Sequence, residues 1–203
     1  MIDSFGRDIS YLRVSVTDRC NLRCRYCMPE AGVKLLGHED ILSFEEIAEV
    51  VGAAAGMGIR HVRLTGGEPL ARRGIVGLVA MVARIDGIDD LSMTTNATRL
   101  TEFAGPLAAA GLHRINISLD TLDPKRFAEL TRGGDMADVL AGIDAADAGG
   151  LTPIKLNCVV GELTTSSDAE AVQAFGRRRG FEVRLIRHMR FATGDFTVVE
   201  GGT

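Results

Sequence analysis

One stretch, Thr17-Asp-Arg-Cys-Asn-Leu-Arg-Cys-Arg-Tyr-Cys-Met-Pro29, follows directly on a short apolar run, Ile9–Val16. The run is rich in β-branched residues and predicts a buried strand, so the stretch is a loop at its carboxyl end. The loop holds Cys20, Cys24 and Cys27 in the spacing C-x3-C-x2-C. Three thiolates this close together bind zinc or iron and sulfide, because both favour soft sulfur ligands. A strand that ends in a ligand-bearing loop is how α/β folds build their sites.

The alternation of short apolar runs with longer amphipathic segments continues along the chain and predicts β/α units around a parallel sheet. Helix starts can be read at the capping box Ser43-Phe-Glu-Glu46, at Pro124 in a first turn and at Ser167-Asp168. Helix ends are expected near Gly58, Gly111 and Gly180. The six expected strands are Ile9–Val16, His61–Thr65, Leu91–Thr95, Arg114–Leu119, Pro153–Val160 and Glu182–Met189.

Six β/α units in one sheet form either an open doubly wound sheet or a partial barrel. We expect the second, a partial (β/α)6 TIM-type barrel of parallel strands in a single α/β domain over residues 1–203. Residues 191–203 read as a chain cut in mid-loop, so we expect a fragment truncated at the C-terminus. Polar segments follow the strand ends, where parallel folds carry their sites. These segments are Thr65–Pro69, Thr94–Asn96, Ser118–Asp120 and His188-Met189.

The amino-acid composition limits the classes of partner that the chain could bind and the compartment in which it is expected. The chain of 203 residues is 46% hydrophobic and 25% charged with a net charge of −4, which argues against a nucleic-acid surface. No stretch approaches the length of a membrane span, and the N-terminus lacks the basic start and apolar run of a signal peptide. Four cysteines, three of them in one loop, suit metal binding in a reducing compartment rather than a disulfide framework. A cytoplasmic location is expected.

The spacing of the cysteines is compatible with two kinds of metal site, a zinc site and an iron–sulfur cluster. Structural zinc normally has four protein ligands, commonly in pairs, and this sequence offers no second pair. A cubane cluster held by three cysteines instead leaves one iron open to a small molecule. The cluster is the favoured reading, and zinc remains the alternative.

With Tyr26 beside the last cysteine, the loop resembles that of the radical S-adenosylmethionine (SAM) superfamily. The resemblance implies a [4Fe-4S] cluster on Cys20, Cys24 and Cys27, with SAM at the open iron and cleaved to a 5'-deoxyadenosyl radical. Gly66-Gly-Glu-Pro69 is similar to the superfamily's second signature, which faces the methionine ammonium. Adjacent glycines allow a close backbone approach, and a carboxylate complements a cation. The resemblance implies SAM contacts at Tyr26, Gly67, Glu68, Asn96, Ser118 and Met189, with Asp120 nearby.

Three cations, Arg13, Arg63 and Lys155, lie inside strands that the pattern predicts to be buried on both faces. A buried, unpaired charge is costly, so each needs a partner. Either they pair with acidic side chains, for which only Asp120 and Glu68 lie near the relevant strand ends, or they point into the barrel toward an anionic substrate. With Thr94 as a hydroxyl donor, they would suit a triphosphate and its sugar.

From Phe5 to Met189 the chain resembles the GTP 3',8-cyclase family of molybdenum cofactor biosynthesis, in strings such as Arg63-Leu-Thr-Gly-Gly-Glu-Pro-Leu-Ala-Arg-Arg73. The resemblance implies GTP contacts at Arg13, Arg63, Thr94 and Lys155. It implies a lyase reaction in which hydrogen is abstracted from C3' of GTP to give 3',8-cyclo-7,8-dihydro-GTP. Its expected partners are GTP, an electron donor to the cluster and, downstream, cyclic pyranopterin monophosphate synthase, with a homodimer as the candidate assembly.

The sequence departs from that family in two places. The cysteines of the family's second [4Fe-4S] cluster are absent, and the spare Cys158 is expected to be an inert core residue. Arg187-His188 stands where the family usually carries an acidic residue. A radical SAM enzyme acting on a different nucleotide or a peptide therefore stays open as the alternative, and a zinc-stabilised binding module is the third hypothesis.

Overall fold

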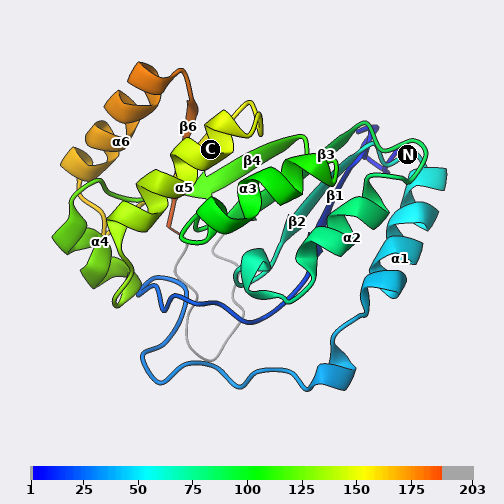
Figure 1. Cartoon of the computed structure of the whole chain (residues 1–203), viewed down its shortest axis with the longest axis horizontal. Helices are drawn as coiled ribbons and strands as arrows, with labels where there is room; N and C mark the ends of the chain where they lie inside the picture. Colours follow the sequence, from blue (N-terminus) through cyan, green and yellow to red (C-terminus); the bar gives the residue numbers. More distant parts are fainter. Residues whose placement is uncertain (1, 189–203) are drawn as a thin grey trace.

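The computed structural model describes residues 2–188, and its central feature is one six-stranded sheet (Figure 1). All neighbouring strands pair in parallel, and strand order follows chain order from β1 to β6. The strands are β1 (Tyr11–Ser15), β2 (His61–Thr65), β3 (Asp90–Thr95), β4 (Arg114–Ser118), β5 (Lys155–Val160) and β6 (Glu182–Arg187). The six expected strands are confirmed to within two residues at their described ends. Met189, the end of the last expected strand, lies outside the described residues.

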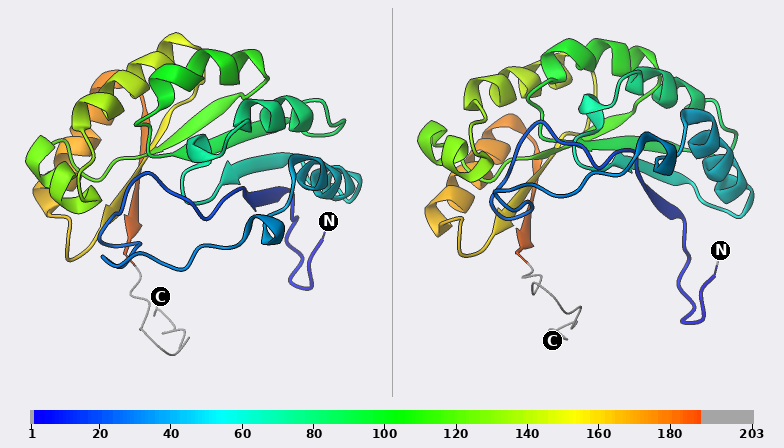
Figure 2. Two further views of the ribbon diagram at one scale, coloured as in Figure 1. Left: turned by 60° about the horizontal axis from the view of Figure 1, so that its bottom comes forward. Right: turned by 90° about the horizontal axis from the view of Figure 1, so that it is seen from below.

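Helices cover one face of the sheet, the convex one, as the two views of Figure 2 show. A doubly wound sheet reverses its strand order at a switch point and carries helices on both faces. Neither feature is present in the described residues, so the partial barrel is confirmed. The helices are α1 (Phe44–Gly56), α2 (Ile75–Val82), α3 (Leu100–Ala109), α4 (Pro124–Thr131), α5 (Met136–Ala148) and α6 (Ser166–Arg179), with 3-10 turns η1 (His38–Asp40) and η2 (Pro69–Ala71).

Helix starts follow local capping chemistry. The Ser43 hydroxyl accepts from the Glu46 N–H at 3.1 Å, and the Glu46 carboxylate accepts from the Ser43 N–H at 2.7 Å, which confirms the capping box. Asp123 caps α4 directly before Pro124. The expected start of α6 at Ser167-Asp168 is wrong by two residues, because Thr165 is the cap and Asp168 the third residue of its capping box. Left-handed or other positive φ angles at helix ends confirm Gly58, Gly111 and Gly180.

The core lies between the sheet and its single layer of helices. Alternate residues of β2, Val62 and Leu64, are fully buried against the helices, whereas Arg63 between them is half-exposed on the inner face. In β1, Arg13 is exposed. The expectation that the charged strands are buried on both faces is therefore wrong, because helices cover only the outer face.

Cys158 belongs to this core. It is 0% exposed, and burial raises the pKa of its thiol to about 12. Its Sγ lies 3.7 Å from the Asp120 carbonyl oxygen. The expectation that Cys158 is an inert core residue is confirmed by its burial.

Among the described helices, none combines the length and apolar character needed to cross a membrane.

Candidate functional site

Residues 17–29, which we call the cysteine loop, are held by two segments that are far apart in the sequence. Near the start of the loop, the Gly67 N–H donates to the Thr17 carbonyl at 2.7 Å. Past its middle, the Arg23 N–H donates to the Thr131 carbonyl at 3.1 Å and the Arg25 N–H to the Leu130 carbonyl at 2.8 Å. The loop is thus fixed between the end of β2 and the end of α4.

The glycine pair after β2 is required by the closeness of this loop. A Cβ atom at Gly66, whose φ is +145°, would lie 2.4 Å from the Thr17 carbonyl oxygen. A Cβ atom at Gly67 would lie 2.3 Å from the Arg19 carbonyl oxygen. Both distances are far inside van der Waals contact, so no larger residue fits without moving the loop. The sequence indicated close backbone approach to a ligand, and the structure adds a close approach to the cysteine loop itself.

The three thiols of the loop differ in exposure and interact with one another. Cys20 and Cys24 are half-buried and Cys27 is exposed. A hydrogen bond between Cys24 and Cys27 raises the pKa of Cys24 and lowers that of Cys27 to about 7. Burial raises the pKa of Cys20, with the negative charges of Glu68 and Cys27 adding to the effect. The thiols therefore share one electrostatic environment, in which a cationic ligand would stabilise their charged forms.

The donor set fits an iron–sulfur cluster. Within residues 2–188, no three His, Cys, Asp or Glu side chains converge as they would around a single metal ion. Zinc would gather its sulfur ligands around one ion at about 2.3 Å, whereas a cubane cluster takes one thiolate per iron. Three soft thiols on one loop, with no fourth cysteine beside them, match a cluster that keeps one iron open.

Glu68 braces the ends of β2 and β3 beside the loop. It is 1% exposed, and one carboxylate oxygen accepts from the Leu70 N–H at 2.9 Å and the Thr95 hydroxyl at 2.8 Å. The other oxygen accepts from the Asn96 N–H at 2.7 Å. Burial raises the pKa of Glu68, and these three donors oppose the rise. The negative charge of Glu68 is one of the causes that raise the pKa of Cys20.

Asn96 reaches from the end of β3 to the cysteine loop. Its Nδ2 donates to Asn21 Oδ1 at 2.9 Å and lies 4.0 Å from Cys20 Sγ. Its Oδ1 accepts from the Thr98 N–H at 3.1 Å and hydroxyl at 2.8 Å. Gly67, Glu68 and Asn96, all expected SAM contacts, are therefore gathered around the first cysteine.

Two further expected SAM contacts lie near the ends of β4 and β6. Tyr26 contacts Asp120 and His188, and Ser118 is the last residue of β4. The Tyr26 hydroxyl bonds the Asp120 carboxylate, and burial is the main cause that raises the pKa of both groups. Ser118 ends β4 half-buried and pairs in register with Asn157. Met189, the remaining expected SAM contact, lies outside the described residues.

The sequence marks His188 as part of a polar strand end and of a departure from the family pattern, and the structure places it against Tyr26. Its Nε2 lies 3.4 Å from the Tyr26 carbonyl oxygen, and the two rings meet edge to face with centroids 6.2 Å apart. Arg187, the other unusual residue at this strand end, is exposed. The end of β6 thus supports the cysteine loop from a third side.

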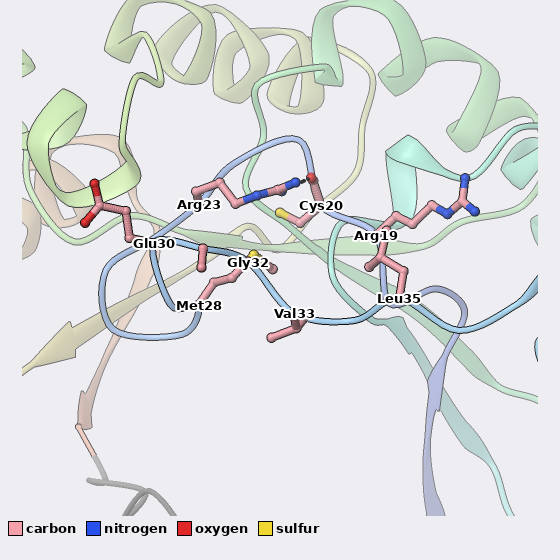
Figure 3. A pocket seen from close by; sticks show the side chains of 9 residues that line it. Arg19, Cys20, Arg23, Met28, Glu30, Gly32, Val33 and Leu35 are labelled. Atoms are coloured by element: carbon pink, nitrogen blue, oxygen red, sulfur yellow. Dashed lines mark hydrogen bonds between the residues drawn. The ribbon is translucent and has the colours of Figure 1, made fainter.

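A cavity of about 340 Å³ borders the loop (Figure 3). Cys20 is the one thiol that lines it, and the Arg23 guanidinium donates to the Cys20 carbonyl oxygen at 2.8 Å. Three other loop residues also line it, and residues 30–35, which follow the loop, supply the rest of the wall. The lining residues are Arg19, Cys20, Arg23, Met28, Glu30, Ala31, Gly32, Val33 and Leu35.

The predicted GTP-binding residues lie on the inner face of the sheet. Arg13 and Arg63 are register partners on β1 and β2, and Thr94 and Lys155 both pair with Asn116 of β4. Residues paired in register share a face of the sheet, so the structure brings all four to one side. Burial lowers the pKa of Arg63, and the neighbouring cations Arg114, Arg13 and Arg184 lower it further. The inner face is therefore a cationic surface.

Two of these cations have protein partners that the sequence did not reveal. Lys155 Nζ lies 2.5 Å from Glu182 Oε2, across the β5–β6 pair. Arg63 donates to the Ser92 hydroxyl at 3.4 Å, and its guanidinium lies 5.2 Å from the centre of the Tyr11 ring. The expectation that few acidic partners are available is wrong for Lys155, because Glu182 is brought to it by the pairing of two strands.

Asn116 is a site residue that the sequence reasoning missed. It is fully buried between Thr94 and Lys155, and its Oδ1 has no hydrogen-bond partner among the described residues. The signal was present in Arg114-Ile-Asn-Ile-Ser118, where polar residues occupy every second position of a strand. Such alternation indicates one polar face, which here is the inner one.

Comparisons with known proteins give consistent results. A profile of the Radical SAM superfamily matches residues 14–175. A protein of Heliobacterium modesticaldum (strain ATCC 51547 / Ice1), named GTP 3',8-cyclase, is 52% identical over 96% of this chain and 60% of its own length. One of the same name from Peptoclostridium acidaminophilum is 48% identical over the same shares. The chain therefore spans 60% of the length of these curated relatives.

Solved structures share the fold at low sequence identity. Streptococcus suis SuiB bound to S-adenosylmethionine superimposes with a TM-score of 0.74 at 19% identity, covering 91% of this chain and 42% of that one. The protein anSMEcpe with bound AdoMet gives 0.67 at 22% identity, covering 89% and 51%.

Three findings agree: the profile match, the parallel partial barrel and the three-cysteine loop after the first strand. They show a cluster and SAM as the cofactors, so the hypothesis of a zinc-stabilised binding module is wrong. This chain belongs to the radical SAM superfamily, whose members use a [4Fe-4S] cluster together with S-adenosylmethionine.

Proposed function

We propose that this chain is the cluster- and SAM-binding part of a GTP 3',8-cyclase, acting in molybdenum cofactor biosynthesis. The observation that carries the proposal is the cationic inner face, where Arg13 and Arg63 pair in register and Thr94 and Lys155 flank Asn116. Sequence identity of 52% to a relative of that name supports it. A triphosphate carries several negative charges, and a row of cations from separate strands is suited to bind it.

The chain's own residues would divide the work between the cysteine loop and the inner face of the sheet. Cys20, Cys24 and Cys27 would hold the cluster. When bound, the cluster and SAM would supply the radical chemistry that the proposed removal of hydrogen from C3' of GTP requires. SAM would be bound by Tyr26, Gly67, Glu68, Asn96, Ser118 and Met189.

On the inner face, Arg13, Arg63 and Lys155 would bind phosphate oxygens and fix the orientation of the sugar. The Thr94 hydroxyl can donate to an oxygen of the ligand, and its register partner Asn116 keeps it next to Lys155. Because Lys155 is paired with Glu182 in the structure, phosphate binding would compete with that carboxylate. Positioning of this kind supplies a large part of catalysis in enzymes that work on bound substrates.

The proposal includes partners that follow from the activity. An electron donor must reduce the cluster, and a cyclic pyranopterin monophosphate synthase would consume the product. A second [4Fe-4S] cluster is expected in relatives of this type, but its cysteines are not in this sequence. A cytoplasmic location, a single domain and a homodimer belong to the same proposal.

The test is an anaerobic assay of a reconstituted full-length version of the protein with GTP, SAM and a reductant, with products identified by mass spectrometry. We expect 5'-deoxyadenosine and 3',8-cyclo-7,8-dihydro-GTP in equal amounts. R13A and R63A should lose GTP binding while SAM still binds, and R84A, at an exposed arginine after α2, is the matched control. Release of 5'-deoxyadenosine only with another nucleotide or a peptide would replace GTP as the substrate.

A further inference from the structure

Arg132 occupies a backbone position that normally favours glycine. It follows α4 with φ +55° and ψ +54°, in the left-handed region that L side chains rarely adopt. The helix α6 ends in the same conformation, and there the residue is Gly180, with φ +72°. Glycine is the usual residue at such helix ends because it has no Cβ atom to strain. An arginine at this position needs a reason beyond ending the helix.

The side chain of Arg132 supplies that reason. Its Nη1 donates to the Arg23 carbonyl oxygen at 2.7 Å and to the Met28 carbonyl oxygen at 2.9 Å. These two carbonyls bracket the segment that contains Cys24 and Cys27. One guanidinium nitrogen therefore ties together the two ends of the part of the loop that carries two of the three thiols.

Backbone contacts from the same helix end act on the same segment. The Thr131 and Leu130 carbonyls accept from the Arg23 and Arg25 N–H groups. The Thr131 hydroxyl is held by donating to the Phe127 carbonyl at 2.7 Å. The backbone hydrogen bonds hold Arg23 and Arg25, and the Arg132 side chain joins the two ends of the segment.

We propose that Arg132 is a positioning residue for the iron–sulfur cluster: it holds residues 23–28 in the closed form in which Cys24 and Cys27 can take their irons. The inference rests on the proposed assignment of the cysteines as ligands. The guanidinium touches the loop backbone and no reacting atom, so its effect reaches the cluster through the loop. Groups that orient ligands in this way change metal retention by about tenfold or more when they are removed.

The alternative is that Arg132 only ends α4, and R132G separates the two roles. Glycine suits the left-handed backbone better than arginine, so a helix-ending role predicts no loss of any kind. A positioning role predicts that the fold keeps its stability while the loop opens. R132K, which keeps the charge but lacks the guanidinium, should be intermediate. R84G is the matched control, since Arg84 is exposed and also follows a helix.

The experiment uses the whole protein in two states. In the metal-free state, thermal unfolding and amide hydrogen exchange are measured, and we expect R132G to have an unchanged or higher Tm but faster exchange in residues 22–28. After anaerobic reconstitution, iron and sulfide per chain and the rate of iron loss to a ferrous chelator are measured. We expect R132G to lose iron about tenfold faster than the wild type, and R84G to match the wild type.

Three results would overturn the inference. Equal rates of iron loss for R132G and the wild type would show that the clamp is not needed. A Tm of metal-free R132G well below that of the wild type would show that Arg132 supports the fold in general. A wild-type protein that binds no iron and sulfide would remove the cysteine assignment, and with it both the proposed function and this inference.

Discussion

Lys155 Nζ lies 2.5 Å from Glu182 Oε2, so a cation proposed to bind phosphate is already paired with a carboxylate on the neighbouring strand. Glu182 also accepts from Arg184 Nε at 2.6 Å. A single carboxylate thus neutralises two cations of the inner face. A triphosphate bound at Lys155 would lie close to the negative charge of Glu182.

We expect E182Q to bind inorganic triphosphate and GTP about fivefold more tightly, because a like charge beside an anion site weakens binding. The glutamine keeps a polar group next to Lys155 while removing the charge. Calorimetric titration at fixed ionic strength measures the change, and E45Q on the exposed first turn of α1 is the control. Weaker binding by E182Q would mean that Glu182 holds Lys155 in position instead of competing with the ligand.

Asp168 should make stability depend on acid pH. Burial favours its neutral form, but hydrogen bonds from Arg126, Thr121 and Thr165 outweigh this and hold the pKa of Asp168 well below its ordinary value of 3.8. A lowered pKa in the folded state means that the stabilisation is fully present above pH 3.8 and is lost as pH falls through the folded value.

D168N should cost about 2 kcal/mol at neutral pH, because the charge-assisted hydrogen bonds that the buried Asp168 carboxylate accepts from the partly exposed Arg126 are weakened. Urea unfolding at a series of pH values measures this. The wild type should lose stability more steeply than D168N below the ordinary pKa of an aspartate. Parallel pH profiles for the two proteins would contradict the assignment.

Gly67→Ala should disturb the cysteine loop, because the new methyl group would meet the Arg19 carbonyl oxygen at 2.3 Å. We expect lower thermal stability and lower iron content after reconstitution. Gly77→Ala is the matched control: Gly77 lies within α2 with open space around it, so alanine should stabilise the helix by up to about 1 kcal/mol. Full iron content in G67A would show that the loop can move away without harm.

The four cysteines should separate into ligands and core. Serine at Cys20, Cys24 or Cys27 should abolish the visible absorption of iron and sulfide after reconstitution, because a hydroxyl is a poor ligand for these irons. Cys158→Ala should keep the cluster and cost about 1 kcal/mol in chemical unfolding, since it only removes a buried sulfur from the core. Loss of the cluster in C158A would place that thiol among the ligands.

Much of the fold could be predicted from the local sequence. The alternation of apolar runs and helical segments located the strands, and Ser43 with Glu46 marked the start of α1, because both signals depend on residues a few positions apart. The cysteine spacing and the glycine pair located the site for the same reason.

Other features depend on pairing between distant segments, and the sequence could not supply them. The contact of Lys155 with Glu182 follows from the register of β5 and β6. The exposure of Arg13 follows from helices covering only one face of the sheet. The clamp made by Arg132 follows from a left-handed turn at a residue whose type does not favour it.

The order of the strands in the sheet is compatible with sequential folding from the N-terminus. Because each strand pairs with the one made just before it, the barrel can grow from its first unit onward during synthesis. The cysteine loop is made early, but its clamp comes from Arg132, 109 residues after Arg23. Under the proposal above, the loop can be clamped by Arg132 only once α4 has folded. Under the same proposal, firm retention of the metal would require that the chain has folded as far as Arg132, which is more than half of this sequence.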